Sequence, residues 1–348
     1  MKRILVTGGS GFIGTNLILN LLKMGYFVLN IDKLNKDTKY TNKFHPANFY
    51  KNYKFIKLDI TKKKLLMETL LNFKPDTIYH LAAESHVDNS IENPSLFMQS
   101  NIIGTYTLLD SVREMLSYKF NKNFKLINIS TDEVYGSIKK NVYSKEDDNY
   151  FTSSPYSASK ASSVHLADAW IKTFDLPIIT TFSSNNFGSY QSPEKLIPKT
   201  IIKSILREKF DIYGKGKNVR NWISVNDNVE ALIKINKKGK VGEKYNIGGL
   251  NNMTNIEIID LICGYFNSKH NGHKSFNYFS LKRFVKDRPG HDFRYALNTK
   301  KIDRIIKIKK NYENFYHQLI KTIIWYENNF LWWKKLLDNK ILSRKGLL

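Results

Sequence analysis

The chain has 348 residues, 42% of them hydrophobic and 25% charged, which is typical of a globular protein able to bury one large core or two unequal ones. Its single cysteine, Cys263, excludes an internal disulfide and a cysteine-cluster metal site, so we expect no metal and a reducing, cytoplasmic setting. The net charge is +24, but the lysines are scattered, which favours a solvated basic surface that attracts an anionic substrate over a nucleic-acid interface.

Neither a membrane span nor a signal peptide is predicted. No apolar stretch reaches the ~20 residues that a membrane-spanning helix needs. The apolar run at the N-terminus is interrupted after a few residues by a glycine-rich turn, which is too early for a signal peptide.

The first segment with a recognisable pattern is KRILVTGGSGFIG, residues 2–14. Residues 3–6 are an apolar run typical of a buried parallel strand, and the apolar residues from 13 to 24 recur at helical spacing. A strand, a glycine turn and a helix in this order are the context that a dinucleotide-binding fingerprint requires. The alternative, a purely structural glycine turn, stays open at this point.

Each residue of the turn has a predicted role in binding a dinucleotide. Gly8 permits the tight turn, Gly11 lets the backbone approach a pyrophosphate, and Gly14 lets the helix pack on the strand. Phe12 and Ile13 begin the helix, whose unpaired N–H groups favour a bound anion. The segment therefore predicts a nucleotide site at the start of the chain.

The second predicted strand, residues 27–32, ends in a carboxylate 18 residues after Gly14. At this spacing Asp32 hydrogen-bonds the adenosine ribose diol and repels a 2′-phosphate. Lys33 follows and could accept such a phosphate. Together they favour NAD over NADP.

Further strands and helices alternate along the chain. A loop is expected up to residue 53, followed by a strand with Asp59 and Ile60 beside the adenine, and by a strand ending in the small residues Ala82 and Ala83. The remaining predicted elements are a helix at 65–73, a strand at 77–83, a helix at 94–118, a strand at 124–130, a helix at 156–174 and a strand at 177–182. This alternation predicts an α/β fold with a Rossmann-like, doubly wound parallel sheet.

The pattern changes at Asn185, where loops lengthen and strands shorten. We predict a dinucleotide-binding domain over 1–184 with about 222–250, and a smaller C-terminal α/β substrate domain over 185–221 with 251–348. The aromatic-rich helix predicted at 312–337 indicates packing more than a ligand site.

Two short motifs carry the candidate chemistry. Tyr156 and Lys160, four residues apart, lie on one helix face, where a nearby ammonium stabilises a phenolate so that the tyrosine can act as a base. Asp132 and Glu133 follow Thr131 at the end of a predicted strand. Alternatively, the first pair is a surface pair and the second a solvated loop pair.

Together these residues resemble the extended short-chain dehydrogenase/reductase family, and within it the nucleotide-sugar 4,6-dehydratases, most closely those acting on dTDP-glucose. The matching segments run through nearly the whole chain: LAAESHVDNSI (81–91), STDEVYG (130–136), SPYSASK (154–160), NNFGSYQSPEKLIP (185–198), YGKGKNVRNW (213–222) and DRPGHDFRY (287–295). The resemblance implies bound NAD, a nucleoside diphosphate glucose substrate, a role in deoxysugar synthesis such as that of rhamnose, and a homodimer formed through helices 94–118 and 156–174.

The resemblance also implies a division of labour on the hexose. Tyr156, with Thr131 as hydrogen-bonding partner and Lys160 supporting the phenolate, removes the proton of the 4-hydroxyl while hydride leaves C4. Glu133 removes the C5 proton and Asp132 protonates the departing C6 hydroxyl. Two adjacent carboxyls with opposite tasks require an environment that separates their pKa values.

The remaining site residues come from the same resemblance. Ser100 and Asn185 join the cofactor contacts, and Ser85 and His86 lie near the hexose. The residues implied around the nucleotide diphosphate are Asn186, Lys195, Leu196, Arg220, Asn255, Arg288 and His291. Arginine suits a diphosphate because its guanidinium group binds in a bidentate way.

Two other functions remain open from the sequence. A nucleotide-sugar 4-epimerase of the same fold would use Tyr156, Lys160 and Thr131 but not the carboxyl pair. A non-catalytic dinucleotide sensor or nucleic-acid-binding protein would need none of them. The choice between dTDP-glucose and UDP-glucose also stays open, since one methyl group is worth only about 1–3 kcal/mol in a pocket.

Overall fold

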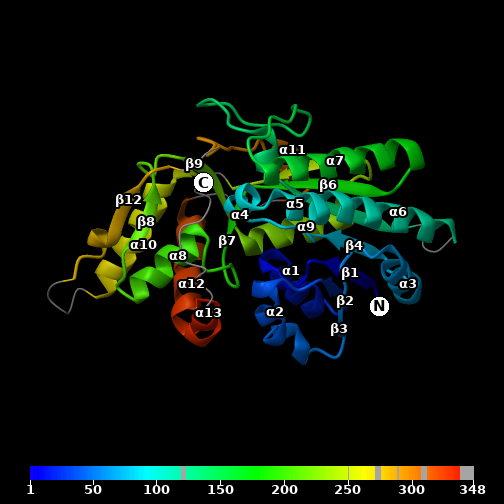
Figure 1. Cartoon of the computed structure of the whole chain (residues 1–348), viewed down its shortest axis with the longest axis horizontal. Helices are drawn as coiled ribbons and strands as arrows, with labels where there is room; N and C mark the ends of the chain where they lie inside the picture. The colour runs from blue at the N-terminus through cyan, green and yellow to red at the C-terminus, as the bar shows by residue number, and fades with distance from the viewer. Residues whose placement is uncertain (119–122, 250, 271–275, 288–289, 307–311, 338–348) are drawn as a thin grey trace.

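The computed structural model describes residues 1–118, 123–249, 251–270, 276–287, 290–306 and 312–337. Its centre is a seven-stranded sheet in which all neighbouring strands are parallel, in the order β10-β6-β5-β4-β1-β2-β3 (Figure 1). The strands are β1 (Arg3–Thr7), β2 (Phe27–Asp32), β3 (Tyr53–Lys57), β4 (Thr77–His80), β5 (Lys125–Thr131), β6 (Ile178–Ser183) and β10 (Lys244–Ile247). The predicted doubly wound parallel sheet is confirmed.

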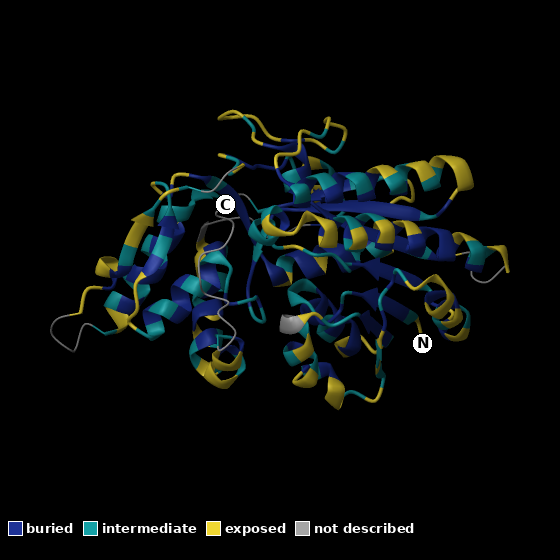
Figure 2. Cartoon of the chain, viewed as in Figure 1, coloured by how far each residue is buried: buried dark blue, intermediate teal, exposed yellow. Residues whose placement is uncertain are grey.

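Helices cover both faces of this sheet because alternate side chains of each strand point to opposite sides. Ile4 and Val6 of β1 pack in a core with α1 (Phe12–Lys23) and α9 (Val225–Lys238). Leu5, between them, packs in the other core. That core includes side chains of α3 (Lys63–Phe73), α6 (Gly104–Ser117) and α7 (Pro155–Phe174). Figure 2 shows the sheet buried between helices whose outer faces are exposed.

The helix predicted at 94–118 contains an irregular segment. It consists of α5 (Pro94–Phe97), the π-helical segment η2 (Met98–Ile103) and α6. Ser100 and Asn101 lie in η2. Wide π-helical turns of this kind are frequent at functional sites because they reposition side chains relative to a regular helix.

The prediction of a loop from Lys33 to Tyr53 is wrong. This stretch contains α2 (Lys36–Lys43) and the 3₁₀ helix η1 (Pro46–Phe49). Asn35 caps the start of α2, since its Oδ1 accepts hydrogen bonds from the backbone N and the Oγ1 of Thr38. The stretch lacks an apolar period, so only its capping residues indicate a helix.

A second, smaller set of elements lies beside the sheet, at the left of Figure 1. It has a three-stranded sheet in the order β11-β9-β7 and a parallel pair of β8 and β12. These strands are β7 (Asn185–Phe187), β8 (Phe210–Tyr213), β9 (Val219–Ser224), β11 (Asn251–Thr254) and β12 (Lys282–Val285). The helices of this smaller part are α8 (Leu196–Ile205), α10 (Asn255–Lys269), α12 (Tyr312–Asn328), α13 (Phe330–Leu337) and the short η4 (Tyr278–Leu281), which packs in the same core. The other short helices of the chain are α4 (Val87–Glu92), η3 (Asp132–Tyr135) and α11 (Lys300–Asp303).

The aromatic end of the chain forms two helices, α12 and α13, instead of the single helix predicted. Tyr326 and Trp333 are fully buried, and the Trp333 indole N–H donates to the Tyr326 carbonyl oxygen at 2.8 Å. These aromatic side chains therefore pack in a core, as predicted. In the described part of the chain, no helix combines the length and apolar character needed to cross a membrane.

Candidate active site

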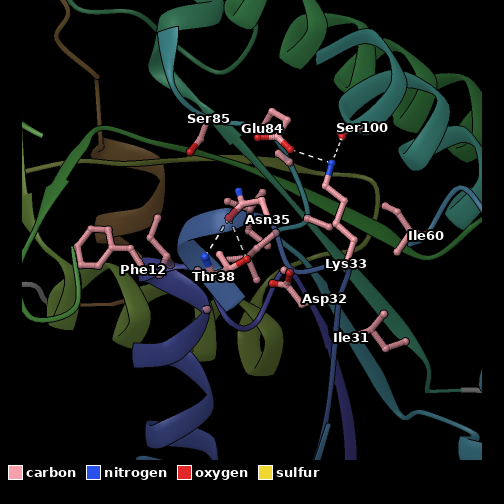
Figure 3. A pocket seen from close by; sticks show the side chains of 18 of the residues that line it. Phe12, Ile31, Asp32, Lys33, Asn35, Thr38, Ile60, Glu84, Ser85 and Ser100 are labelled. Carbon is pink, nitrogen blue, oxygen red and sulfur yellow. Dashed lines mark hydrogen bonds and ion pairs between the residues drawn. The ribbon is translucent and has the colours of Figure 1, made fainter. Parts of the chain in front are cut away.

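A pocket opens at the carboxyl ends of β1, β2, β4 and β5, where parallel α/β sheets bind ligands. Figure 3 shows part of its lining. Every residue predicted from sequence to contact the cofactor lines it, with the exception of Asn185 in β7. The lining consists of Gly8, Gly11, Phe12, Ile13, Gly14, Ile31, Asp32, Lys33, Asn35, Thr38, Leu58, Asp59, Ile60, Leu81, Ala82, Ala83, Glu84, Ser85, Ser100, Ile129, Ser130, Tyr156 and Lys160.

In the glycine turn between β1 and α1, the backbone around Gly8 and Gly14 leaves no room for a side chain, whereas Gly11 faces open space that a ligand can approach. Gly8 has a φ of 72°, and a Cβ placed on it would lie 2.6 Å from the backbone N of Ala82. A Cβ on Gly14 would lie 2.5 Å from the Gly8 carbonyl oxygen. A Cβ on Gly11, the N-cap of α1, would have only that same oxygen within 4 Å, at 3.3 Å. The pocket can therefore bring an anionic group close to the N-terminus of α1.

Asp32 is fixed at the end of β2. Its Oδ2 accepts a hydrogen bond from the backbone N of Ser10 at 3.1 Å, and its Oδ1 accepts one from the backbone N of Leu34 at 2.8 Å. Burial raises the pKa of this carboxyl, opposed by these two hydrogen bonds and by Lys33. Each oxygen retains lone-pair capacity for a further donor, such as a ribose hydroxyl.

Lys33 reaches across the pocket from the end of β2. Its Nζ lies 2.7 Å from Oε1 of Glu84 and donates to the Oγ of Ser100 at 2.6 Å, as Figure 3 shows. Lys33, which the sequence predicts as a possible ligand of a 2′-phosphate, is thus paired with the Glu84 carboxylate. Glu84 was not among the residues predicted from sequence.

The candidate acid–base pair lies where β5 runs into η3. Thr131 Oγ1 donates to Asp132 Oδ1 at 3.3 Å and accepts from the backbone N of Glu133 at 3.3 Å. Asp132 is buried, and its Oδ2 has no hydrogen-bond partner among the described residues. Burial, together with repulsion from the Glu133 carboxylate and against attraction from Arg220, raises the pKa of Asp132 to about 8. Asp132 is therefore protonated at neutral pH.

Tyr156 and Lys160 project from the first turns of α7 into the pocket, whose lining does not include Thr131, Asp132 or Glu133. Burial raises the pKa of the Tyr156 phenol well above its ordinary value; Glu133 raises it further, and a hydrogen bond with Thr131 lowers it. Burial also lowers the pKa of Lys160 to about 8, and its Nζ donates to the Ile129 carbonyl oxygen at 2.8 Å. The effect of burial on the Tyr156 pKa is thus larger than the stabilisation of the phenolate that the sequence led us to expect from Lys160. The Lys160 ammonium retains two further N–H groups that can donate to other partners.

The residues predicted near the hexose link the two parts of the molecule. The Lys195 Nζ donates to the Ser85 carbonyl oxygen at 3.4 Å, and the His86 Nε2 lies 3.2 Å from Oε2 of Glu194. His86 is the N-cap of α4, and Lys195 is the N-cap of α8. Ser85 also lines the pocket, and its contact with Lys195 therefore connects the pocket lining with the start of α8.

The other predicted substrate residues occupy separate places in the smaller part. Arg220 is buried in β9, and its guanidinium group donates to the carbonyl oxygens of Val219, Asp292 and Phe293 at 2.9–3.3 Å. The His291 Nδ1 lies 2.6 Å from the Asp287 carboxylate. Asn186 lies in β7, Leu196 begins α8 and Asn255 begins α10. Arg288 lies outside the described residues.

The structure adds several pocket residues that were not predicted from sequence. Glu84 directly follows Ala83, after the end of β4, and Ser130 directly precedes Thr131 at the end of β5. Because ligands bind at the carboxyl ends of parallel strands, both residues were predictable from their positions. Asn35 and Thr38 belong to the region assigned as a loop. Helix capping at Asn35 was the signal that could have placed them.

The parallel sheet, the glycine turn, the carboxylate ending β2 and the Tyr156–Lys160 pair in one pocket define the extended short-chain dehydrogenase/reductase class. Comparison with known proteins narrows this class. A model of the GDP-mannose 4,6 dehydratase family matches residues 5–319, and the chain belongs to this family.

Named relatives cover the whole chain. It is 42% identical over 351 residues to a probable dTDP-glucose 4,6-dehydratase of Sinorhizobium fredii and 41% identical over 367 residues to the dTDP-glucose 4,6-dehydratase of Escherichia coli, with 99% of each chain covered in both cases. Among solved structures, the dTDP-glucose 4,6-dehydratase of Streptomyces venezuelae with NAD bound matches 96% of this chain and 99% of its own, with 35% identity and a TM-score of 0.84. A UDP-glucose 4-epimerase of Thermus thermophilus, at 23% identity and a TM-score of 0.81, shares the fold.

Proposed function

We propose that this protein is an NAD-dependent nucleotide-sugar 4,6-dehydratase, a hydro-lyase that converts dTDP-glucose to the 4-keto-6-deoxy sugar nucleotide and water. The observation that carries the proposal is the carboxyl pair beside the Tyr156 phenol. Asp132 holds a proton at neutral pH and Glu133 is its immediate neighbour, so one site offers both an acid and a base. Full-length similarity to dTDP-glucose 4,6-dehydratases supports the same reaction.

The pocket residues fit NAD. The N-terminus of α1 and the open face of Gly11 suit the pyrophosphate, and Asp32 suits the adenosine ribose diol. The Ser130 hydroxyl lines the pocket, is buried, and has no partner among the described residues, so it is available to a polar group of the ligand. NAD held by these residues would supply the redox chemistry of the reaction, as the acceptor of a hydride from C4 of the sugar and its donor to C6.

Tyr156 and Thr131 act at the sugar C4 hydroxyl. The phenol and the threonine hydroxyl are hydrogen-bonded neighbours, so both can contact one substrate oxygen. Because burial holds the Tyr156 pKa high, the side chain needs a nearby positive charge to lose its own proton, and the resulting phenolate can then accept the proton of the C4 hydroxyl. Lys160 supplies that charge, since its ammonium is oriented by the Ile129 carbonyl oxygen and has further N–H groups to donate.

Asp132 and Glu133 act at C6 and C5. Once C4 is a ketone, the C5 proton is acidic, and Glu133 removes it. Asp132 donates its proton to the departing C6 hydroxyl, which leaves as water. A protonated carboxyl is required for the second task, and the buried position of Asp132 provides it.

A 4-epimerase of the same fold is the nearest alternative. Its chemistry needs only Tyr156, Thr131 and Lys160, because hydride leaves C4 and returns to C4. A buried carboxyl with its pKa raised to about 8 would serve no step of that reaction and costs folding free energy. The Asp132–Glu133 pair therefore favours dehydration.

The nucleotide-sugar site extends from Ser85 and His86 to the smaller part of the chain. The family resemblance implies that Lys195 and His291 contact the diphosphate. We assign the same region to Asn186, Leu196, Arg220, Asn255 and Arg288. In this arrangement Arg220 also acts on the catalytic site, since its positive charge lowers the pKa of Asp132.

We further propose the division into two domains given by the sequence, 1–184 with about 222–250 and 185–221 with 251–348. Two hydrophobic clusters support most of this division, although Ile302 and Ile306 of the 251–348 segment pack in the first cluster and Trp222 packs in the second. One packs α9 and Ile247 of β10 against α1, and another packs Phe187 with α8, α10 and α12. The single cysteine, Cys263, is buried and unpaired, which agrees with a cytoplasmic location.

We propose that the protein is a homodimer joined through α5–α6 and α7. Large apolar side chains are exposed on these helices: Leu96, Ile103, Tyr106 and Phe174 are each 43–50% exposed. Two such helices from each copy could pack together and bury them. A Tyr106→Glu substitution should give a monomer by light scattering during gel filtration, whereas Glu114→Gln on the same helix should leave the dimer intact.

The function is tested by incubating the purified protein with dTDP-glucose and with UDP-glucose separately. We expect formation of the 4-keto-6-deoxy product from dTDP-glucose without added oxidant or reductant. A strict requirement for a stoichiometric second redox substrate would overturn the proposed cycle. Faster product formation from UDP-glucose would keep the reaction but replace the substrate.

A further inference from the structure

We propose that Glu84 is a specificity-determining residue for the dinucleotide. By neutralising Lys33 it withholds the cation that a 2′-phosphate would need, so that the pocket selects NAD and rejects NADP. This inference rests on the dinucleotide cofactor of the proposed function. It adds a second determinant to Asp32, the carboxylate that the sequence assigns to the ribose diol.

The position of Lys33 makes it the natural ligand for a 2′-phosphate. It directly follows Asp32 at the end of β2, and both side chains line the pocket (Figure 3). The other lysine in the lining, Lys160, lies at the catalytic end, where its Nζ donates to the Ile129 carbonyl oxygen. Lys33 is therefore the cation beside the expected ribose.

That cation is already engaged. The Lys33 Nζ lies 2.7 Å from the Glu84 carboxylate and donates to the Ser100 hydroxyl at 2.6 Å. Only 35% of the Lys33 side chain and 21% of the Glu84 side chain are exposed, so water screens the pair less than it screens a surface pair. A phosphate that approached Lys33 would have to displace Glu84 or accept its repulsion.

The backbone of Glu84 is fixed in a way that favours this pairing. Its N–H donates to the Asn101 side-chain oxygen at 2.8 Å, and its carbonyl oxygen accepts from the Asn101 side-chain nitrogen at 3.0 Å. Asn101 is buried in η2 and also donates to the Ser159 hydroxyl at 2.8 Å. Glu84 is thus held by the segment that also presents Ser100 to Lys33.

The charge balance of the pocket shows why one carboxylate matters. Asp32 and Glu84 each carry a negative charge near the ribose, and Lys33 cancels one of them. The two carboxylates are close enough to interact, since repulsion from Glu84 contributes to the raised pKa of Asp32. Removing the Glu84 charge while keeping its shape would free Lys33 and weaken the repulsion of a phosphate.

The test is a competition between cofactors on the full-length protein. Wild type and Glu84→Gln are incubated with equal concentrations of NAD and NADP, free nucleotide is removed, and the bound nucleotides are separated and quantified. We expect the bound NADP-to-NAD ratio to rise about tenfold in Glu84→Gln, the scale of one charge interaction in a partly buried site. The double variant Lys33→Gln/Glu84→Gln should lose this rise.

A matched control is Glu68→Gln, which removes the same charge from an exposed position of α3 outside the pocket lining. It should leave the ratio at the wild-type value. An unchanged ratio in Glu84→Gln, an equal rise in Glu68→Gln, or a rise that persists in the double variant would overturn the role of Glu84. Failure of the wild type to retain either nucleotide would overturn the cofactor assignment itself and this inference with it.

Discussion

Replacement of Asp132 by Asn should lower activity and change how stability depends on pH. Asp132 is 3% exposed, and its pKa is raised from 3.8 to about 8. Between these values the folded protein keeps a proton that the unfolded chain has lost, so the unfolding free energy of the wild type falls by about 1.4 kcal/mol per pH unit. Asn carries no titrating group, so the variant lacks this loss.

The magnitude follows from the pH interval. From pH 5 to pH 7, the stability of Asp132→Asn relative to wild type should rise by up to about 3 kcal/mol. Any hydrogen bond that the amide lacks costs the same at both pH values, so the change in the difference isolates the titration of Asp132. Urea unfolding of both proteins at the two pH values, with the same bound nucleotide, measures it. A stability difference that does not vary with pH would refute the raised pKa.

Four further outcomes are expected. The wild-type dehydration rate should fall as pH rises through about 8, where Asp132 loses its proton; a rate that keeps rising above pH 8 would remove Asp132 as the acid. Tyr156→Phe should slow oxidation at C4 by about 10²- to 10⁴-fold with substrate affinity nearly unchanged, measured as NADH absorbance in a stopped-flow instrument; reduction at the normal rate would indicate another base. Lys160→Ala should slow the same step, whereas the conservative Lys160→Arg should recover part of the rate; equal effects of both would count against a role for the positive charge. Glu133→Gln should still reduce the bound nucleotide but should lose exchange of the C5 hydrogen with deuterated solvent; undiminished exchange would move the C5 base elsewhere.

Much of the fold could be predicted because it depends on regular apolar patterns. Most strands of the main sheet contain an apolar run, such as Ile4–Val6 in β1 and Phe27–Leu29 in β2. Helices α1 and α7 show clear starting signals, a glycine turn and a serine cap at Ser154. The stretch from Lys33 to Tyr53 was missed because α2 has almost no apolar face. Its structure depends instead on single capping contacts such as that of Asn35.

The candidate site likewise contains features that the local sequence predicts and features that depend on the folded structure. Gly8, Asp32 and Tyr156, which local motifs identify, line the pocket, whereas the Thr131–Glu133 motif is not part of its lining. The pairing of Lys33 with Glu84 could not be predicted, because it joins side chains 51 positions apart that meet only when β2 and β4 lie in one sheet. The raised pKa of Asp132 likewise depends on burial, which the local sequence does not reveal.

The most direct test of dehydration is a single incubation of the wild-type protein with dTDP-glucose in deuterated water. The proposed chemistry predicts a 4-keto-6-deoxy product that carries one solvent deuterium, at C5, because Glu133 exchanges its proton with solvent before C5 is reprotonated. The hydrogen that C4 loses should appear at C6, and no NADH should accumulate. A product with the full complement of hydroxyl groups and inverted configuration at C4, without deuterium at C5, would contradict the account and identify an epimerase.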